Sequence, residues 1–278
     1  MANSDAVYDA PDRSAELAGL VDLERYPLFD LASDKGAALL SRCRRQLEEE
    51  GACVLPGFLL PEAVALARAE LEPRISEAYY CEKQHNPYLD EDDPNYPQDH
   101  PRNRPQVSDL GALADDQIAD GTVLRRLYLS PEVQAFVAAL LGVAALYPYE
   151  DPLGSLNLNV FQPGQQLGWH YDNADWALTL MLQQAEAGGV YEYVPWVRSD
   201  TDENYDRVAK ILDGTDDAVR RLSMAAGALV LFRGRKSIHR VTPVEGNRPR
   251  LIAVLSYDTQ PGVMLTDYNR RLFYGRAN

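Results

Sequence analysis

Long apolar runs and clusters of positive charge are absent from this sequence of 278 residues. No apolar run approaches the roughly 20 residues that a membrane-spanning helix requires, so no such helix is expected. The segment 1–12 is polar and has no basic region followed by an apolar one, so no secretory signal is predicted. The net charge of −15 disfavours nucleic acids and anionic membranes as partners, because phosphate contacts need clustered lysine and arginine.

Cysteine is scarce as well. The three cysteines, Cys43, Cys53 and Cys81, form no Cys-x-x-Cys pair, and an odd number cannot be fully paired within one chain. Because no secretory signal is visible, reduced thiols and a cytoplasmic location are expected. Cys81 and His85 have the spacing of a metal-ligand pair, but without a second pair they are weak evidence for zinc.

The first half of the chain is predicted to supply supporting helices. Residues 1–30 have little periodicity and are expected to form an irregular arm. Asp34 is a suitable N-cap and Gly51 a suitable stop for one helix, and the short strand 52–55 is expected to follow. Two further helices are predicted, at 61–72, with an extension toward 79, and at 132–141.

Between these helices the composition changes abruptly. Residues 81–107 are rich in proline, aspartate, asparagine and tyrosine, and they show no regular pattern. A loop of this length inside a compact domain is either functional or disordered. We interpret it as a lid or substrate loop, and solvated disorder is the alternative.

Beyond Val143 the periodicity changes to that of strands. Residues 155–161 alternate strictly, with leucine and valine on one face and Asn157 and Asn159 on the other. Two asparagines are costly in an apolar core, so we expect them to face a polar cavity. A helical insert is predicted at 204–212, with a second piece that reaches 222. The other predicted strands are 143–149, 176–182, 190–194, 227–233 and 251–257.

A short motif, His170-x-Asp172, follows the turn at Gly164. Residues two apart on a strand point to the same face, so this histidine and carboxylate can bind one metal ion. The chain has only four histidines, and His239 lies far along it. Two histidines and one carboxylate on adjacent strands form the facial triad of non-haem Fe(II) oxygenases, which leaves three positions open. A bare His-x-Asp pair is common by chance, so the flanking residues decide.

Those flanking residues resemble the Fe(II)/2-oxoglutarate-dependent oxygenases of the prolyl-hydroxylase and phytanoyl-hydroxylase type. The resemblance covers roughly residues 143–260. The similar motifs are Phe161-x-Pro163-Gly164 before His170-x-Asp172, and His239-x-Val241-x-Pro243-Val244-x-Gly246 with a following arginine.

The resemblance implies a double-stranded β-helix, a jelly-roll barrel that is mainly β with flanking helices (α+β). We expect a single domain, 1–278, in which residues 31–142 provide the support helices and the lid loop. Residues 143–260 are expected to form the jelly-roll core, with the metal near its mouth.

The resemblance also implies cofactors. Fe(II) is expected at His170, Asp172 and His239, which would act as the metal ligands and the catalytic centre. 2-Oxoglutarate would chelate the iron, and O2 would take the remaining position.

The far carboxylate of 2-oxoglutarate requires a buried cation. Arg250 opens an apolar strand and is favoured over Arg248, which precedes a proline in a turn. Arginine suits this role because its planar fork matches a carboxylate. Asn157 and Asn159 are the other predicted cofactor-binding residues.

A narrower resemblance concerns the substrate. The block 169–183, with 186–193, is similar to small oxygenases that halogenate or hydroxylate free amino acids such as lysine and ornithine. In the halogenases of that group glycine stands at the position of Asp172, which opens a coordination position for chloride. The carboxylate present here therefore implies hydroxylation of a free amino acid, with succinate and CO2 as co-products. Acidic residues crowd the loop 81–107 and the turn at Glu150 and Asp151, so we expect this amino acid to be cationic. The candidate substrate contacts are Glu150, Asp151, Asn173, Asp175 and Ser256.

Three alternatives remain open. In the first, the substrate is a carrier-tethered or peptidyl amino acid. In the second, the protein is a non-catalytic metal-binding jelly roll. In the third, it is a cupin-like dioxygenase without cosubstrate. The triad with Arg250 argues against the second alternative, and the small number of histidines argues against the third. The amino acid, the carbon attacked and the oligomeric state are left open by the sequence.

Overall fold

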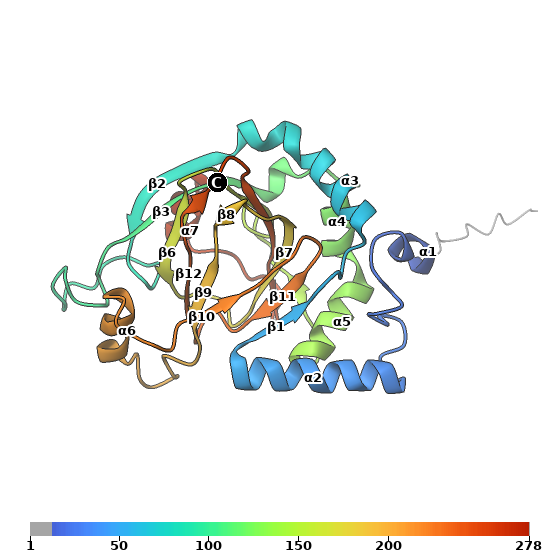
Figure 1. Cartoon of the computed structure of the whole chain (residues 1–278), viewed down its shortest axis with the longest axis horizontal. Coiled ribbons are helices and arrows are strands. Elements are labelled where there is room, and N and C mark those ends of the chain that lie inside the picture. The colour runs from blue at the N-terminus through green and yellow to red at the C-terminus, as the bar shows by residue number, and fades with distance from the viewer. Residues whose placement is uncertain (1–12, 278) are drawn as a thin grey trace, which may run out of the picture.

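An antiparallel sheet that curls around the interior dominates the computed structural model, which describes residues 13–277 (Figure 1). Of its eleven strands within these residues, ten follow the order β1-β11-β7-β14-β5-β3-β6-β12-β9-β10, and the eleventh, β2, pairs with β3. Two short ladders, β13 with β8 and β15 with β4, accompany it. The strands are β1 (Ala52–Leu55), β2 (Tyr79–His85), β3 (Gln106–Leu113), β4 (Tyr147–Pro148), β5 (Leu156–Phe161), β6 (Gln166–His170), β7 (Ala177–Gln183), β8 (Ala187–Gly188), β9 (Tyr191–Val194), β10 (Arg220–Leu222), β11 (Leu229–Phe232), β12 (Ile238–Val241), β13 (Val244–Glu245), β14 (Arg250–Leu255) and β15 (Tyr257–Asp258).

Helices cover the outside of this sheet, as predicted. In Figure 1, α2 to α5 lie on one side of the strands and α6 lies on the opposite side. No helix within the described residues is long and apolar enough to cross a membrane. The helices are α1 (Arg13–Ala18), α2 (Asp34–Glu50), α3 (Pro61–Leu71), α4 (Val123–Leu129), α5 (Pro131–Leu141), α6 (Tyr205–Leu212) and α7 (Asp267–Tyr274), with 3-10 turns at Glu72–Glu77 and Asp115–Gln117.

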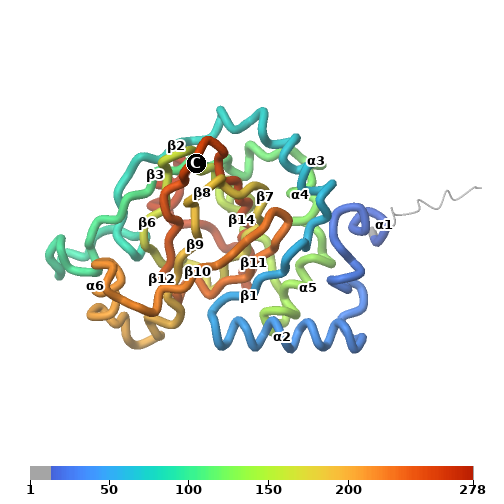
Figure 2. The backbone as a smooth tube through the Cα atoms, in the orientation of Figure 1, coloured from blue at the N-terminus to red at the C-terminus, as the bar shows by residue number. Residues whose placement is uncertain are grey.

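Helix α2 shows how local sequence sets an element. Ser33, in extended conformation, is the N-cap, and its hydroxyl accepts a hydrogen bond from the amide of Gly36 at 3.2 Å. Asp34, the predicted cap, is instead the first helical residue. Gly51 ends the helix with a φ of 72°, a left-handed conformation that favours glycine. The chain then enters β1, which lies beside β11 from late in the sequence (Figure 2).

The alternation in β5 separates two environments. Leu156, Leu158 and Val160 face outward into the main apolar core, which also contains side chains from α2 to α5. Asn157 and Asn159 face the other way and line a cavity, as the alternation predicted. One face of the strand therefore attaches the helices, and the other face contributes to the interior of the barrel.

Several predicted segments differ from the observed structure. Within 1–30, residues 1–12 lie outside the described part of the chain, but α1 is a helix and Val21 and Tyr26 are buried in the core, so the segment is not an irregular arm after residue 12. The loop predicted at 81–107 is shorter, because β2 and β3 take up both of its ends. The second helical piece before 222 is the strand β10.

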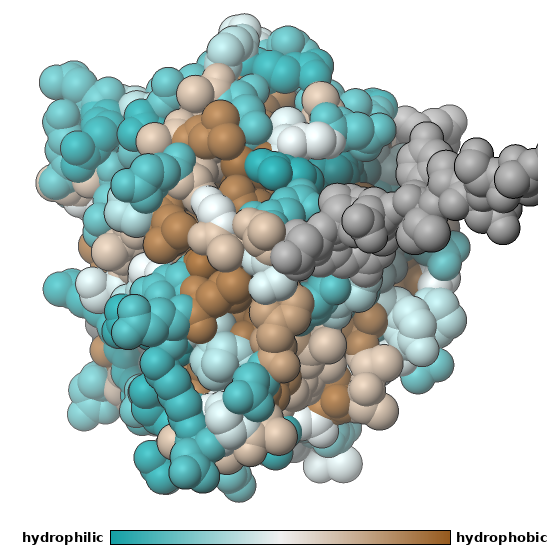
Figure 3. All heavy atoms as spheres, turned by 90° about the vertical axis from the view of Figure 1, so that its right-hand side faces the viewer, coloured by the Kyte–Doolittle hydropathy of each residue, from teal (hydrophilic) through white to brown (hydrophobic). Residues whose placement is uncertain are grey.

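Other elements were not predicted at their observed extent. The strand expected at 143–149 is reduced to the two residues of β4, and α4 and α7 were not predicted. Figure 3 shows the helical side of the molecule, where apolar residues are exposed between hydrophilic ones. Among the described residues, Leu66 and Leu129 are exposed large apolar side chains.

Candidate metal centre and substrate cavity

The two histidines of the predicted triad are brought together by strand register. His170 is the last residue of β6 and pairs directly with His239 on β12. The centroids of the two imidazole rings are 4.0 Å apart, and both side chains are buried. Residues that are distant in sequence therefore form one histidine pair near the end of a strand ladder.

Asp172 completes the cluster from just beyond β6. Its amide donates a hydrogen bond to the carbonyl of Gly234 at 3.1 Å, which holds the backbone beside the start of β12. Its Oδ1 lies 3.8 Å from His170 Nε2 and 3.5 Å from His239 Nε2. Ligands about 2.1 Å from one ion lie about 3 Å apart in an octahedron, so these three atoms have nearly the spacing of a single metal site.

Hydrogen bonds of the two Nδ1 atoms orient the imidazole rings of His170 and His239. His170 Nδ1 contacts the carbonyl of Gly168 at 2.8 Å, and His239 Nδ1 contacts that of Ser237 at 3.0 Å. A carbonyl only accepts, so each Nδ1 carries a proton, and each Nε2 is the nitrogen directed toward the cluster. Burial, together with the neighbouring His239, holds the pKa of His170 well below its ordinary value, which favours the neutral, metal-binding form.

The carboxylate of Asp172 has no other partner that would explain its position. Burial raises the pKa of this carboxyl, but His239 and His170 lower it more, so its pKa lies below its ordinary value. Its Oδ2 is buried without a hydrogen-bond partner among the described residues. A buried carboxylate oxygen with no partner, beside the Nε2 atoms of two histidines, fits a divalent cation.

Gly234 provides the space that Asp172 occupies. A Cβ added to Gly234 would lie 1.7 Å from Asp172 Oδ2 and 2.5 Å from its Cγ. The side chain of Asp172 therefore packs directly on the glycine backbone. Gly234 lies in the motif that leads to His239, but nothing in the sequence indicated that it touches the triad.

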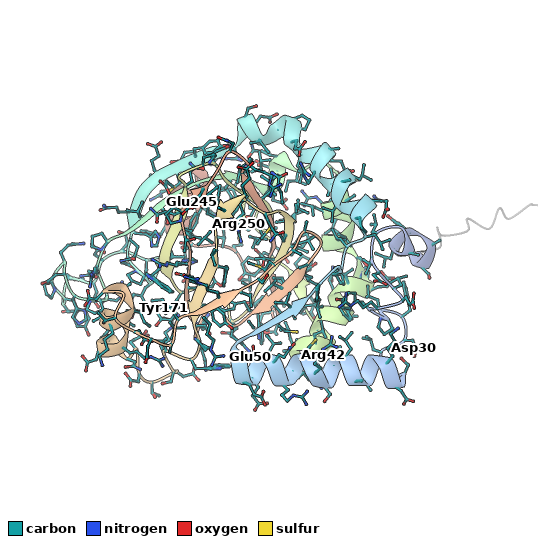
Figure 4. All side chains as sticks on the ribbon, viewed as in Figure 1. Asp30, Arg42, Glu50, Tyr171, Glu245 and Arg250 are labelled. Atoms are coloured by element: carbon teal, nitrogen blue, oxygen red, sulfur yellow. The ribbon has the colours of Figure 1, made fainter. Side chains whose placement is uncertain are left out.

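Arg250 lies at the other end of the interior and has an unsatisfied charge. It is 2 % exposed, and neither Nη atom has a hydrogen-bond partner among the described residues. Burial lowers its pKa to about 10 despite the nearby hydroxyl of Tyr191. Figure 4 shows Arg250 within the barrel, and it lines a cavity of about 380 Å³. A buried guanidinium with free donors requires an anion such as a carboxylate.

A row of inward-facing residues connects the two ends of the interior. On the paired strands β5 and β14, Asn157 lies opposite Val254, Asn159 opposite Ile252, and Phe161 opposite Arg250. The Arg250 guanidinium lies over the Phe161 ring, 5.2 Å from its centroid. Asn157 and Asn159 line the cavity beside the triad, whereas Arg250 lines the other cavity.

Arg248 has a different environment from Arg250. It is exposed, its Nε donates to the carbonyl of Gln184 at 2.9 Å, and its Nη2 donates to that of Ala185 at 3.2 Å. It therefore joins two turns at the surface. Tyr191, which the sequence did not single out, lines the Arg250 cavity and stacks on His239 with centroids 5.3 Å apart.

A second cavity, of about 180 Å³, opens beside the triad. His170 and Asp172 line it together with Asn157, Asn159, Asn173 and Ser256, so four of the predicted cofactor or substrate contacts lie there. Its aromatic lining residues are Tyr149, Trp176, Tyr257, Phe273 and Tyr274.

Three predicted substrate contacts are not at this cavity. Glu150 is exposed, and Asp175 forms an ion pair with Arg235 at 2.7 Å. Asp151 is buried in an ion pair with Arg270, and it also accepts backbone hydrogen bonds in its own turn. None of these three carboxylates therefore lines the cavity beside the triad.

The cavity is closed by segments whose role was missed or only partly predicted. From the loop between β2 and β3, Leu89 reaches the cavity, and the amide of Tyr171 anchors this loop through the carbonyl of Pro87 at 2.7 Å. Helix α7 contributes Asn269, Phe273 and Tyr274. It lies beyond the range of the family resemblance, and eight residues are too short for a clear helical pattern.

The curled sheet, the His-Asp-His cluster and the buried arginine together define a 2-oxoglutarate- and Fe(II)-dependent oxygenase fold. The chain belongs to the family described as Halogenase D, whose model matches residues 36–265. No curated protein sequence matches the chain.

Solved structures share this fold at low sequence identity. An oxidoreductase of the 2OG-Fe(II) oxygenase family from Burkholderia pseudomallei is 14% identical, with 81% of this chain and 92% of that chain covered and a TM-score of 0.53. The epimerase SnoN, in complex with Fe3+ and α-ketoglutarate, is 17% identical, with 80% and 84% covered and a TM-score of 0.54. HygX from Streptomyces hygroscopicus, with nickel, 2-oxoglutarate and hygromycin B bound, is 15% identical, with 78% and 86% covered and a TM-score of 0.51. These relatives agree with the predicted cofactors Fe(II), 2-oxoglutarate and O2.

Proposed function

We propose that this protein hydroxylates an unactivated C–H bond of a free amino acid, with Fe(II), 2-oxoglutarate and O2. The observation that supports hydroxylation most directly is the carboxylate of Asp172 beside His170 and His239. In the halogenases that the chain resembles, a glycine at this position leaves room for chloride. A carboxylate there favours transfer of oxygen.

Each residue of the centre has a defined part in this proposal. His170, Asp172 and His239 would hold the iron, and Arg250 would pair with the far carboxylate of 2-oxoglutarate. The bound cofactors supply the chemistry, in which 2-oxoglutarate and O2 become succinate and CO2 while one oxygen atom is inserted into the C–H bond. Asn157 and Asn159 line the cavity beside the triad, and in this proposal their amides bind the cosubstrate.

The protein also orients the substrate and limits the access of water. The cavity beside the triad is lined by amides, hydroxyls and aromatic rings, and Asp172 is the carboxylate among its lining residues. Neutral oxygen acceptors and ring faces bind ammonium groups, so the proposed preference for a cationic amino acid rests on them. Asn173 and Ser256 are the predicted substrate contacts that remain at the cavity. A cytoplasmic location is part of the proposal, supported by three buried, unpaired cysteines.

The test uses anaerobically purified protein. It is combined with Fe(II), 2-oxoglutarate and a panel of free amino acids in the presence of chloride, and O2 is then admitted. We expect a product that has gained one oxygen atom, formed together with succinate, from lysine or ornithine. Succinate formation without any modified amino acid would contradict a free amino acid as substrate. A carrier-tethered amino acid, tested in parallel, would then be the alternative.

A further inference from the structure

Helix α7 forms one wall of the substrate cavity and is firmly attached to the barrel. Arg270 on this helix pairs with the buried Asp151, with Nη2 2.7 Å from Oδ2. The same carboxylate oxygen accepts a hydrogen bond from the amide of Leu265 at 2.9 Å. Leu265 itself packs so closely on Gly154 that an added Cβ there would lie 2.1 Å from its Cδ1. The helix therefore holds its inner side chains in fixed positions.

The inner face of α7 contains a buried amide with an unsatisfied acceptor. Asn269 lines the cavity and is 5 % exposed, and its Oδ1 has no hydrogen-bond partner among the described residues. Phe273, one turn later, lines the same cavity, so both residues lie on the cavity side of the helix. A buried amide oxygen without a partner is energetically unfavourable, so the free protein is destabilised at this position.

We infer that Asn269 is a substrate-binding residue whose side-chain oxygen accepts a hydrogen bond from an amino group of the bound amino acid. An unsatisfied oxygen requires a donor, and the ammonium groups of an amino acid are donors whereas its carboxylate is not. The inference rests on the proposed function and names the group of the substrate that this side of the cavity binds. Because the family model ends at residue 265, α7 lies outside the matched residues.

The alternative is that Asn269 only stabilises the helix. Its backbone amide does contribute to structure, since it donates to the N-cap hydroxyl of Thr266 at 3.2 Å. That bond is kept in any side-chain variant. Replacement of the side chain by leucine, which has a similar size, therefore separates the two roles. A structural amide would make the variant less stable, whereas an unsatisfied one would not.

The experiment measures L-lysine binding by calorimetry under anaerobic conditions, with Fe(II) and 2-oxoglutarate present. Asn269→Leu is expected to weaken L-lysine binding about tenfold or more, since one hydrogen bond to a charged group is lost. Its affinity for 2-oxoglutarate and its melting temperature should be equal to or above those of the wild type. Asn269→Asp, which keeps an oxygen acceptor, should bind L-lysine at least as tightly as the wild type. Arg271→Ala is the matched control, because this side chain lies on the same helix and is 67% exposed.

The outcomes distinguish a failure of the role of Asn269 from a failure of the proposed function. Unchanged L-lysine binding in Asn269→Leu, or a melting temperature below that of Arg271→Ala, would overturn the role of Asn269 while the proposed function stands. If the wild type binds 2-oxoglutarate but neither L-lysine nor L-ornithine, the proposed substrate class fails, and this inference fails with it.

Discussion

Gly234 tolerates no side chain without moving a metal ligand, because Asp172 packs on its backbone. We predict that Gly234→Ala weakens Fe(II) binding by at least about tenfold, since a Cβ would lie 1.7 Å from Asp172 Oδ2 and the carboxylate must move. Fe(II) titration followed by calorimetry measures this effect directly.

The matched control for Gly234 is Gly19. There an added Cβ would meet only the carbonyl of Glu16, at an ordinary 3.5 Å. Gly19→Ala should therefore leave Fe(II) affinity unchanged. Wild-type affinity in Gly234→Ala would show that Asp172 is free to move without losing the metal.

Arg250 and Arg248 provide a second test at the scale of single residues. Arg250→Ala should weaken 2-oxoglutarate binding by roughly 100-fold, since charged hydrogen bonds contribute about 1.5–3 kcal/mol each. Arg248→Ala should have little effect, because this exposed side chain contacts only backbone carbonyls at the surface. Titration of the Fe(II) protein with 2-oxoglutarate checks both variants, and the reverse result would exchange the two assignments.

The predictability of individual site residues depended on their chemistry. His170, Asp172 and His239 were identified because histidine is rare here and the flanking motifs are specific. Tyr191 and Asn269 were missed because their roles arise from tertiary contacts. A tyrosine in an apolar strand and an asparagine in a short terminal helix have many ordinary explanations.

At the scale of elements, helices and strands with strong apolar periodicity were predicted from the sequence, whereas the polar strand β2 was not. Strand β1 has its predicted bounds, and helix α2 differs only by beginning at Asp34, since an amphipathic face and a glycine stop define them. Strand β2 reads Tyr-Tyr-Cys-Glu-Lys-Gln-His and has little apolar alternation, so it resembled a loop. Its pairing with β3 stabilises it through long-range contacts that no local pattern records.

The ion pair between Asp151 and Arg270 predicts how the attachment of α7 depends on pH. Burial alone would raise the pKa of Asp151. Hydrogen bonds from the amides of Gly154 and Leu153 and from Arg270 together lower it by more than burial raises it, so its pKa lies below the ordinary value. A carboxyl with a lowered folded-state pKa stabilises the fold above its unfolded pKa of about 3.9, and this stabilisation is lost as the pH falls below that value.

We therefore expect Asp151→Asn to lower the free energy of unfolding by about 3 kcal/mol at pH 6, where the buried pair is intact in the wild type. The difference between variant and wild type should become smaller below about pH 4. Urea unfolding of the metal-free protein at both pH values measures it. Glu49→Gln, at an exposed position on α2, is the control. A difference that is constant with pH would contradict the ionised pair.

At the scale of the whole molecule, one sheet separates two functions. Its outer face binds the helices through an apolar core, and its inner face carries Asn157, Asn159 and Arg250, which line two cavities. This division explains why the barrel tolerates asparagines and a buried arginine, since the helices already supply the apolar burial that stabilises the fold. The fold class was predictable because the motifs around His170 and His239 resemble those of a known family, and the alternation in β5 predicted only which residues face the cavity.

The reaction outcome tests how family and site combine. The chain belongs to a family described by halogenation, yet its metal cluster contains the carboxylate of Asp172. We predict that the wild type inserts oxygen and forms no chlorinated product even at high chloride, because this carboxylate fills the position that chloride would need. Asp172→Gly should bind Fe(II) more weakly and nearly abolish hydroxylation, since one of three protein ligands is lost. Chlorinated product is expected from this variant only if neighbouring groups also hold the anion. Product mass spectrometry decides the question, and a chlorinated amino acid from the wild type would refute the assignment of Asp172 as a metal ligand.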